Sequence, residues 1–264
     1  FLNAVARVPA HPAIESLWTE EMEDPKGKED TGILITRAGA GTEADSYLYA
    51  VAPSAQWGDD AGNRPAPWVT WFNAARFANW LHNGATAGAD TEDGAYTLVD
   101  HQESGIVPRN PNALWWIPSE DEWYKAAYYD PAKPGGAGYW QYPTRSDAPP
   151  RMAEAPGTAP AANFNNVYLA HQEDGWGVLT PVCAYVGTRG PWGTCDQAGL
   201  LWEWTAGIYV DPEGPNRIVR GGSWGPGVTP PMKTIRRDYG PMGSAGYYRD
   251  DDTGFRLAAP AVDE

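Results

Sequence analysis

Cysteine is scarce in this 264-residue sequence, which has only Cys183 and Cys195. A metal site built from cysteine thiolates alone needs more than two ligands, so the composition excludes one. The pair brackets a turn-like stretch, AYVGTRGPWGT. It forms either a local disulfide, in an exported protein, or two separate buried thiols, in a cytosolic one. The spacing leaves both open, because a disulfide depends on the distance between the Cα atoms.

Long apolar runs and clusters of basic residues are also missing. No stretch of eighteen apolar residues occurs, and the N-terminal FLNAVARVPAHP lacks the charged-then-apolar plan of a signal peptide. We therefore expect no membrane span, and a sequence from which a targeting segment has already been removed. The chain has 34 acidic and 19 basic residues, a net charge of −15, and no basic stripe that would bind phosphates. Nucleic acid is not an expected partner.

Aromatic residues, glycine and proline are abundant, with 14 Trp, 14 Tyr, 30 Gly and 25 Pro. This composition favours turns and short elements over long helices. Two helices are nevertheless predicted. The first covers residues 70–83, where Thr70 caps an apolar pattern of helical period. The second begins at Ser119, which forms a capping box with Glu122, and stops at Asp130 before a proline.

Short strands are predicted between turn residues, at 32–38, 46–51, 95–99, 217–221 and 254–258. Two helices with scattered strands indicate an α+β fold with many loops. The stretch 131–160 has the Pro- and Gly-rich composition of a linker, but its Tyr and Trp residues predict a loop that packs on the body. We therefore expect one domain over residues 1–264.

Five motifs occur in a characteristic order: PWVTWFNAARFANWLH, WWIPSEDEWYKAAYYDP, GLLWEWTAG, RIVRGGSW and RDDDTGFRLA. Together they resemble the formylglycine-generating enzyme family, also called the sulfatase-modifying factor family, over residues 68–258. The resemblance implies an irregular variant of the C-type lectin fold, with two main helices, short strands and many loops. The sequence is most similar to exported bacterial members that have no assigned reaction.

The enzyme of this family is a copper-dependent oxidase that converts a sulfatase cysteine to formylglycine. It uses a pair of cysteines shortly after the Gly-Gly-Ser-aromatic motif, and Cu(I) favours such thiolate ligands. Here residues 223–254 contain no cysteine, and both cysteines lie upstream of GLLWEW. Met232 and Met242 offer only thioethers and are interpreted as packing residues. The resemblance therefore does not extend to the copper site.

A second branch of the family, the iron-dependent sulfoxide synthases, takes its iron ligands largely from a separate helical domain with a His-x-x-x-His-x-Glu pattern. The four histidines here include no pair four residues apart: His11, His82, His101 and His171. We expect neither copper nor iron, and we favour a protein that is not an enzyme.

Two other arrangements that resemble catalytic sites are given structural interpretations. Ser223 lies among glycines as in a nucleophile elbow, but Pro226 follows instead of a helix. The acidic residues 250–252 are adjacent on a loop, where neighbouring side chains point in different directions. We expect a solvated turn there that pairs with Arg249 and Arg256.

The resemblance also implies structural calcium. The family binds Ca²⁺ beside its WEW motif through carboxylate and backbone oxygens, which this hard cation prefers. In CDQAGLLWEW the matching ligands are the side chains of Asp196 and Glu203 and the carbonyls of Gly199 and Leu201.

A second calcium site of the family matches two further steps of this sequence. The first step is Asn163 and Phe164, and the second is Asp174 and Trp176. The spacing is shorter here, so Asn165 is an alternative to Asn163. At both sites the competing interpretation is that the polar residues only cap turns.

The resemblance places a ligand-binding surface on the loop 224–253, between the GGSW and GFR strands. Tyr and Arg anchor interfaces at low entropic cost. The candidate residues are Trp224, Arg236, Arg237, Tyr239, Tyr247, Tyr248 and Arg249. The competing interpretation is that the rings pack inward and the arginines pair with aspartates.

We therefore predict a non-catalytic, extracytoplasmic module, in the periplasm, on the cell surface or secreted, that binds a protein or glycan on a calcium-stabilised scaffold. One alternative is an oxidoreductase of the formylglycine-generating or iron-dependent type. The other is a structural subunit of a surface layer or larger complex. The sequence does not separate the binding module from the structural subunit.

Overall fold

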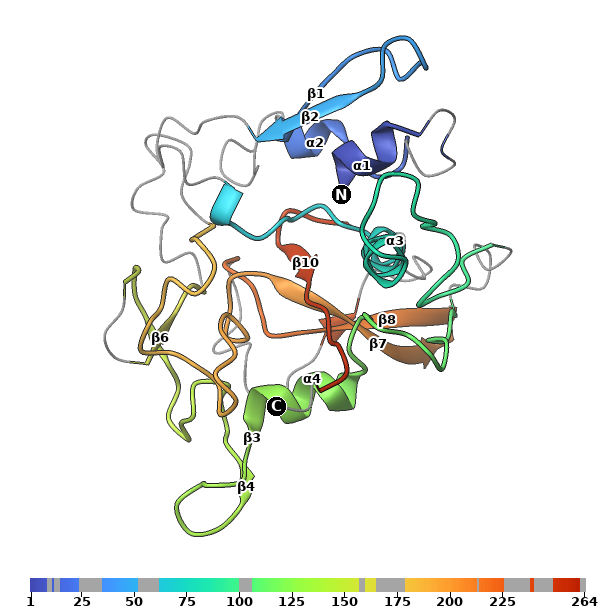
Figure 1. Cartoon of the computed structure of the whole chain (residues 1–264). Coiled ribbons are helices and arrows are strands. Elements are labelled where there is room, and N and C mark those ends of the chain that lie inside the picture. The colour runs from blue at the N-terminus through green and yellow to red at the C-terminus, as the bar shows by residue number, and fades with distance from the viewer. Residues whose placement is uncertain are drawn as a thin grey trace.

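The computed structural model describes residues 1–8, 11, 15–23, 35–51, 62–99, 106–156, 160–164, 179–212, 214–225, 238–239 and 249–261. In this part of the chain a few helices and short strands are joined by long irregular loops (Figure 1). The predicted mixture of helices and strands is confirmed.

The largest sheet has four strands in the order β10-β7-β8-β9. They are β7 (Trp202–Asp211), β8 (Gly214–Arg220), β9 (Asp238–Tyr239) and β10 (Thr253–Phe255). β7 and β8 form a long antiparallel hairpin, and β10 runs parallel to β7 with Gly254 opposite Glu203. The parallel pairing brings the residue that follows β10, Arg256, next to Glu203, which lies 53 positions earlier.

The helices α3 (Trp71–His82) and α4 (Glu120–Tyr128) lie on opposite sides of the β7–β8 hairpin (Figure 1). Both were predicted, and the predicted caps are present. Thr70 accepts a backbone N–H of the first turn at 3.1 Å, and Ser119 and Glu122 form the capping box. These local signals satisfy the donors that a helix N-terminus leaves free.

The main core packs α3 against the hairpin. Trp71 and Trp204 are fully buried, and their indole N–H groups donate to the carbonyls of Thr205 and Val69 at 3.1 and 2.8 Å. The buried guanidinium of Arg217 lies 3.5 Å from the centroid of the Trp71 ring. Large rings can be buried here because their polar groups are hydrogen-bonded.

A smaller layer at the N-terminus contains two short helices and a two-stranded sheet (Figure 1). Its elements are α1 (Leu2–Ala6), α2 (Glu20–Glu23), β1 (Ile35–Ala38) and β2 (Leu48–Val51). α1 packs on β2, and α2 packs on β1. The predicted strands 32–38 and 46–51 are thus confirmed with shorter described bounds, and 217–221 is confirmed as the end of β8. The predicted strand 254–258 is confirmed only at Gly254 and Phe255, which lie in β10.

The predicted strand at residues 95–99 is wrong. Tyr96 makes only an isolated bridge with Arg109. The reason is Asn79 of α3, whose side chain accepts the Tyr96 N–H at 2.8 Å and donates to the Tyr96 carbonyl at 2.9 Å. The backbone groups that a neighbouring strand would have bound are therefore satisfied by a helix side chain.

The stretch 131–160 packs on the body, as predicted, in its described residues. Tyr142 is buried against Ala162, Phe164 and Ala198, and the indole of Trp140 donates to a carboxylate at 3.0 Å. Short strand pairs join the stretch to its neighbours: β3 (Tyr129–Asp130) with β4 (Gly138–Tyr139), and β5 (Arg151–Met152) with β6 (Ala161–Ala162).

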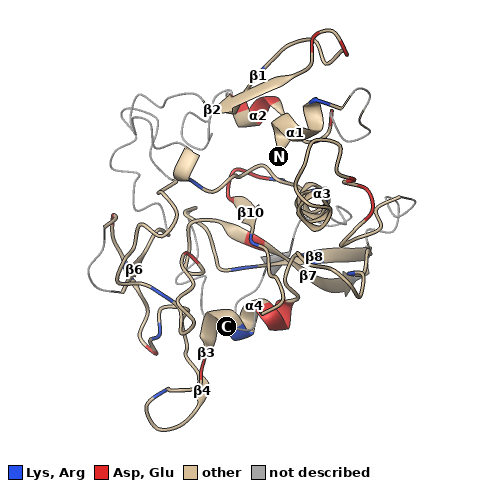
Figure 2. Ribbon diagram, viewed as in Figure 1, with Lys and Arg blue, Asp and Glu red and all other residues tan. Residues whose placement is uncertain are grey.

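Among the described residues, no helix is long and apolar enough to cross a membrane. Acidic residues gather in the first turn of α4, coloured red in Figure 2, where they oppose the positive end of the helix dipole. The basic residues of the described chain are scattered over several elements in the same view.

Candidate cation site beside the disulfide

Cys183 and Cys195 form a disulfide, with their Cα atoms 5.2 Å apart. This decides between the two alternatives that the sequence left open. Because the chain has no other cysteine, it has no free thiol. The bridge closes a loop just before β7, the strand that carries Glu203.

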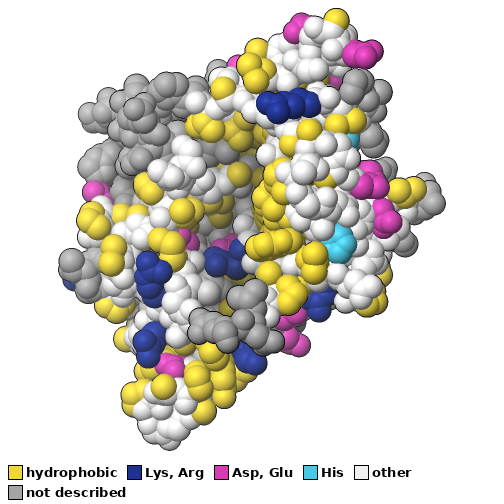
Figure 3. All heavy atoms as spheres, viewed as in Figure 1, with side chains coloured by type: hydrophobic (Ala, Val, Ile, Leu, Met, Phe, Trp, Pro, Cys, Tyr) yellow, Lys and Arg dark blue, Asp and Glu magenta, His cyan; other side chains and the backbone are white. Residues whose placement is uncertain are grey.

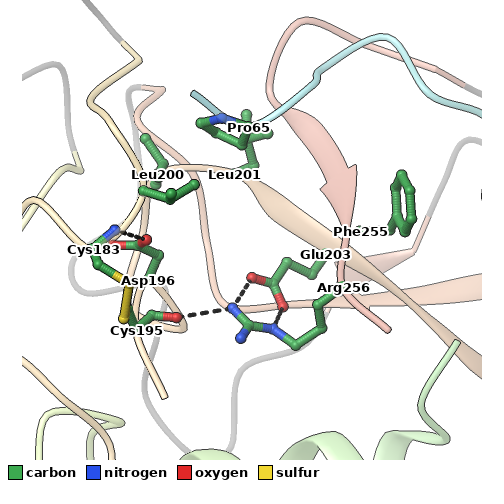
Figure 4. Close-up of a pocket in the computed structure, with 10 residues that line it drawn as sticks. Pro65, Cys183, Cys195, Asp196, Leu200, Leu201, Glu203, Phe255 and Arg256 are labelled. Carbon is green, nitrogen blue, oxygen red and sulfur yellow. Dashed lines mark hydrogen bonds and ion pairs between the residues drawn. A yellow bond between two sulfur atoms is a disulfide. The ribbon is translucent and has the colours of Figure 1, made fainter. Parts of the chain in front are cut away.

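Glu203 and Arg256 form a two-pronged ion pair at the start of β7. The Nε and Nη2 atoms of Arg256 donate to the two carboxylate oxygens of Glu203 (Figure 4). The indole of Trp123, on α4, donates to the same carboxylate at 2.6 Å. Burial acts to lower the pKa of Arg256, but the adjacent carboxylate of Glu203 outweighs it and holds that pKa above its usual value.

Asp196 lies beside the disulfide. Its Oδ2 atom accepts the Cys183 N–H at 2.6 Å, and the carbonyl of Cys195 accepts from Arg256 at 3.0 Å. Burial raises the pKa of Asp196. The second oxygen of this carboxylate has no hydrogen-bond partner among the described residues.

A cavity of about 260 Å³ contains this group of residues. Asp196, Glu203, Arg256 and the disulfide line it together with apolar side chains (Figure 4). The lining of this cavity therefore contains two carboxyl groups and one guanidinium. Arg189 is exposed and is not a lining residue, but it contacts the Cys195 Sγ atom at 3.4 Å, and its charge acts to lower the pKa of Asp196.

Three of the four residues of the first predicted calcium site, Asp196, Leu201 and Glu203, line this cavity, and Gly199 does not. Gly199 and Leu201 lie between Asp196 and Glu203 in the chain. Gly199 has φ +80°, and a Cβ atom there would lie 2.2 Å from the carbonyl oxygen of Asn163. Only glycine permits this close approach.

The donor set fits a hard cation. A carboxylate offers about four lone-pair positions, of which Glu203 uses three and Asp196 uses one. Carboxylate and carbonyl oxygens at several positions of an irregular loop are typical calcium ligands. Any cation here shares Glu203 with the guanidinium of Arg256.

The second predicted calcium site is only partly described. Asn163 is buried and pairs with Gly199 in a parallel bridge, so the two predicted sites adjoin through the backbone. Phe164 is buried in the apolar cluster around Tyr142. The remaining predicted members lie outside the described residues: Asn165, Asp174 and Trp176.

The predicted ligand loop is also described only in part. Trp224 is half-buried and packs on the cluster of Leu200 and Leu201, and its backbone N–H donates to the Leu200 carbonyl at 3.0 Å. Arg249 pairs with Glu21 at 3.8 Å, and Tyr239 lies in β9. Four predicted members lie outside the described residues: Arg236, Arg237, Tyr247 and Tyr248.

The acidic turn at residues 250–252 does not pair with the arginines we expected. Arg256 pairs with Glu203 instead, because β10 places it beside β7, and Arg249 reaches Glu21. The three aspartates do bring carboxylate oxygens within 4.8 Å of one another. Asp252 accepts the hydroxyl of Ser223 at 2.8 Å, which gives this serine a structural contact.

The partner expected for Arg256 from the sequence, the acidic turn 250–252, is wrong. No local pattern links Arg256 to a glutamate 53 residues away. Glu203 and Arg256 are neighbours because β10 pairs with β7 in parallel.

Comparison with known proteins agrees with the motif order. Residues 42–261 match the family model described as the sulfatase-modifying factor enzyme 1-like domain. The chain belongs to this family.

Two similar relatives are proteins called inactive Cα-formylglycine-generating enzyme 2. The one from Bos taurus is 29% identical over 146 residues, covering 55% of this chain and 44% of that protein. The one from Mus musculus is 34% identical over 89 residues, covering 34% and 29%. The chain thus spans less than half of these relatives.

Three solved structures are similar to this family member. CarF has a TM-score of 0.49 at 22% identity, covering 80% of this chain and 72% of its own. Treponema denticola variable protein 1 has a TM-score of 0.48 at 20% identity, covering 79% and 74%. PvdO from Pseudomonas aeruginosa has a TM-score of 0.41 at 17% identity, covering 81% and 68%.

Proposed function

We propose that this protein is a non-catalytic, extracytoplasmic binding module on a calcium-stabilised scaffold. The observation that carries the proposal is the disulfide between Cys183 and Cys195. It uses both cysteines of the chain, and it lies before the GGSW motif at residues 221–224. The oxidase of the family needs two cysteines after that motif.

The copper chemistry of the family depends on thiolate donors that this chain does not offer. Cu(I) is held by soft sulfur ligands, and serine, tyrosine or aspartate oxygens do not replace them. Residues 224–253 contain two methionines and no cysteine. Two relatives have the word inactive in their names, which supports a non-catalytic role for this member of the family.

The extracytoplasmic location rests on the same bridge. Disulfides form and persist in oxidising compartments and are rare where thiols are kept reduced. The family further suggests an irregular C-type-lectin-like arrangement, in which the described sheet β10-β7-β8-β9 is the central element.

Calcium would be held by the side chains of Asp196 and Glu203 with the carbonyls of Gly199 and Leu201. When bound, it would supply a structural cross-link that neutralises the carboxylate of Asp196. Arg256 would orient Glu203, and the Cys183 N–H would orient Asp196. These contacts fix the loop before β7 without any reacting group.

The ligand of the module would bind the loop 224–253, where Tyr and Arg side chains supply anchors for a protein or glycan. Trp224 and Arg249 fix the two ends of this loop by their contacts with Leu200 and Glu21. The anchored ends would limit the entropy that the loop loses on binding.

The absence of catalysis is tested by offering copper and substrate together. The purified protein is incubated with Cu(I), oxygen and a cysteine-containing sulfatase peptide, and the peptide mass is followed beside an active family enzyme. We expect no conversion of cysteine to formylglycine. Turnover of the peptide, with copper retained at one equivalent per chain, would contradict the proposal.

A further inference from the structure

A large apolar groove adjoins the cation site. It has a volume of about 650 Å³, within the range of about 300–1,000 Å³ that small-molecule sites occupy. Its walls come from α1, β1, α3 and the residues after β10, and almost all of them are apolar. Figure 3 shows a hollow with hydrophobic side chains along its wall near the centre of this face.

The groove and the smaller cavity share four lining residues, Pro65, Val182, Phe255 and Arg256. One continuous surface therefore runs from an apolar wall to the charged group at the disulfide. Phe77 and Phe255 meet edge to face on the apolar side, with ring centroids 5.8 Å apart. A ligand could lay an apolar body on these rings and place its head group in the cavity.

The charge of the head group follows from the residues at the polar end. Glu203 is neutralised by Arg256, whereas Asp196 has no ion pair among the described residues and keeps one oxygen without a hydrogen-bond partner. An anionic head would meet the negative charge of Asp196 in a confined space, and a cationic head would neutralise it. The net charge of −15 on the whole chain acts in the same direction.

We infer that the groove and cavity together bind a small molecule with an apolar body and an ammonium head, and that Asp196 receives the ammonium. None of the described residues of the loop 224–253 lines the groove or the cavity. Calcium and the ammonium would neutralise the same carboxylate, so each would weaken the binding of the other.

Three probes with one apolar chain and different heads test the inference: octylamine, octanol and octanoate. Their binding to the calcium-free protein is measured by calorimetry at pH 7. Octylamine is expected to bind at least tenfold more tightly than octanoate, with octanol between them. Equal binding of all three, or tighter binding of octanoate, would overturn the inference.

Variants separate the head-group contact from the groove. Asp196→Asn should reduce octylamine binding to the level of octanol and leave octanol unchanged. Val182→Arg places a cation where the groove and the cavity meet, and it should weaken the binding of octylamine at least tenfold. Val186→Arg is the matched control, because this valine is also exposed but lines neither site. If Asp196→Asn keeps the preference for octylamine, the inference is wrong.

Competition distinguishes this inference from the calcium proposal. Calcium should weaken octylamine binding at least threefold if both proposals hold. Octylamine binding with no measurable calcium binding would contradict only the calcium-stabilised scaffold. Calcium binding with no preference for octylamine would contradict only the groove.

Discussion

Asp196 is a single residue whose negative charge is poorly stabilised in the folded protein. Burial raises its pKa above the ordinary value of 3.8, so stability falls as the pH rises from that value through the raised one. Asp196→Asn removes the charge, and asparagine accepts the backbone φ of +60° as aspartate does. We expect a higher melting temperature for this variant at pH 7 in chelator, by roughly 2–4 °C for each kcal/mol gained.

The response of the melting temperature to calcium should differ between the two proteins. Calcium should raise the melting temperature of the native protein by more than that of Asp196→Asn. Asp147→Asn is the control, because Lys133 lowers the pKa of this exposed carboxyl and its removal should give no gain. A lower melting temperature of Asp196→Asn in chelator would show that its charge is already compensated.

Tyr96 controls stability at high pH. Burial raises the pKa of its hydroxyl to about 12, and that hydroxyl accepts the Ile117 N–H at 2.9 Å. The unfolded chain releases the proton near pH 10, so the folded state loses about 2.7 kcal/mol from this group between pH 10 and 12. Tyr96→Phe should be less stable than the native protein at pH 8, by about 1 kcal/mol. Its free energy of unfolding should fall less above pH 10.

Denaturant titrations of the native protein and of Tyr96→Phe at pH 8, 10 and 11.5 measure this difference. The gap between the two proteins should narrow as the pH rises. A gap of constant size would mean that the tyrosine ionises equally in the folded and unfolded states.

At the scale of elements, the disulfide holds both sides of the cation site. The Cys183 N–H binds Asp196, and the Cys195 carbonyl binds Arg256. A bridge that closes a short loop contributes about 3 kcal/mol by restricting the unfolded chain. The double variant Cys183→Ser, Cys195→Ser should lose about this much stability, and its calcium affinity should fall at least threefold.

Denaturant unfolding and calcium calorimetry on the double variant, at a temperature where it remains folded, measure both effects. Unchanged calcium affinity would show that the backbone positions Asp196 and Arg256 without the bridge. Reduction of the native protein by dithiothreitol should reproduce the variant.

The sequence predicted the helices better than the sheet. Thr70 and Ser119 lie within one turn of the groups they cap, so helices α3 and α4 carry their own start signals. β7 was not predicted as a strand, because its Gly207 and mixed residues lack a clear alternation and its pairing includes a register shift. Long-range pairing, not local pattern, decides which residues it meets.

The candidate site was also predictable only in part. The motif around WEW placed Asp196 and Glu203 in one short stretch, and the structure brings both to one cavity. The guanidinium of Arg256 arrives through β10, and the groove combines α1, α3 and β1, so neither could be derived from local spacing.

At the scale of the whole molecule, the chain keeps the motifs of the family but lacks the cysteines that bind copper in the enzyme of the family. The described fold retains the two helices and the sheet that carry the family motifs, while both cysteines serve a structural bridge. Since function depends on the site and not on the fold, such a chain is expected to bind rather than to oxidise.

The most direct test of this account counts calcium, copper and iron per chain in the purified protein, before and after chelation, and follows the melting temperature. We expect about one or two calcium ions, no stoichiometric copper or iron, and a melting temperature that falls when calcium is removed. Copper or iron near one equivalent per chain would contradict it.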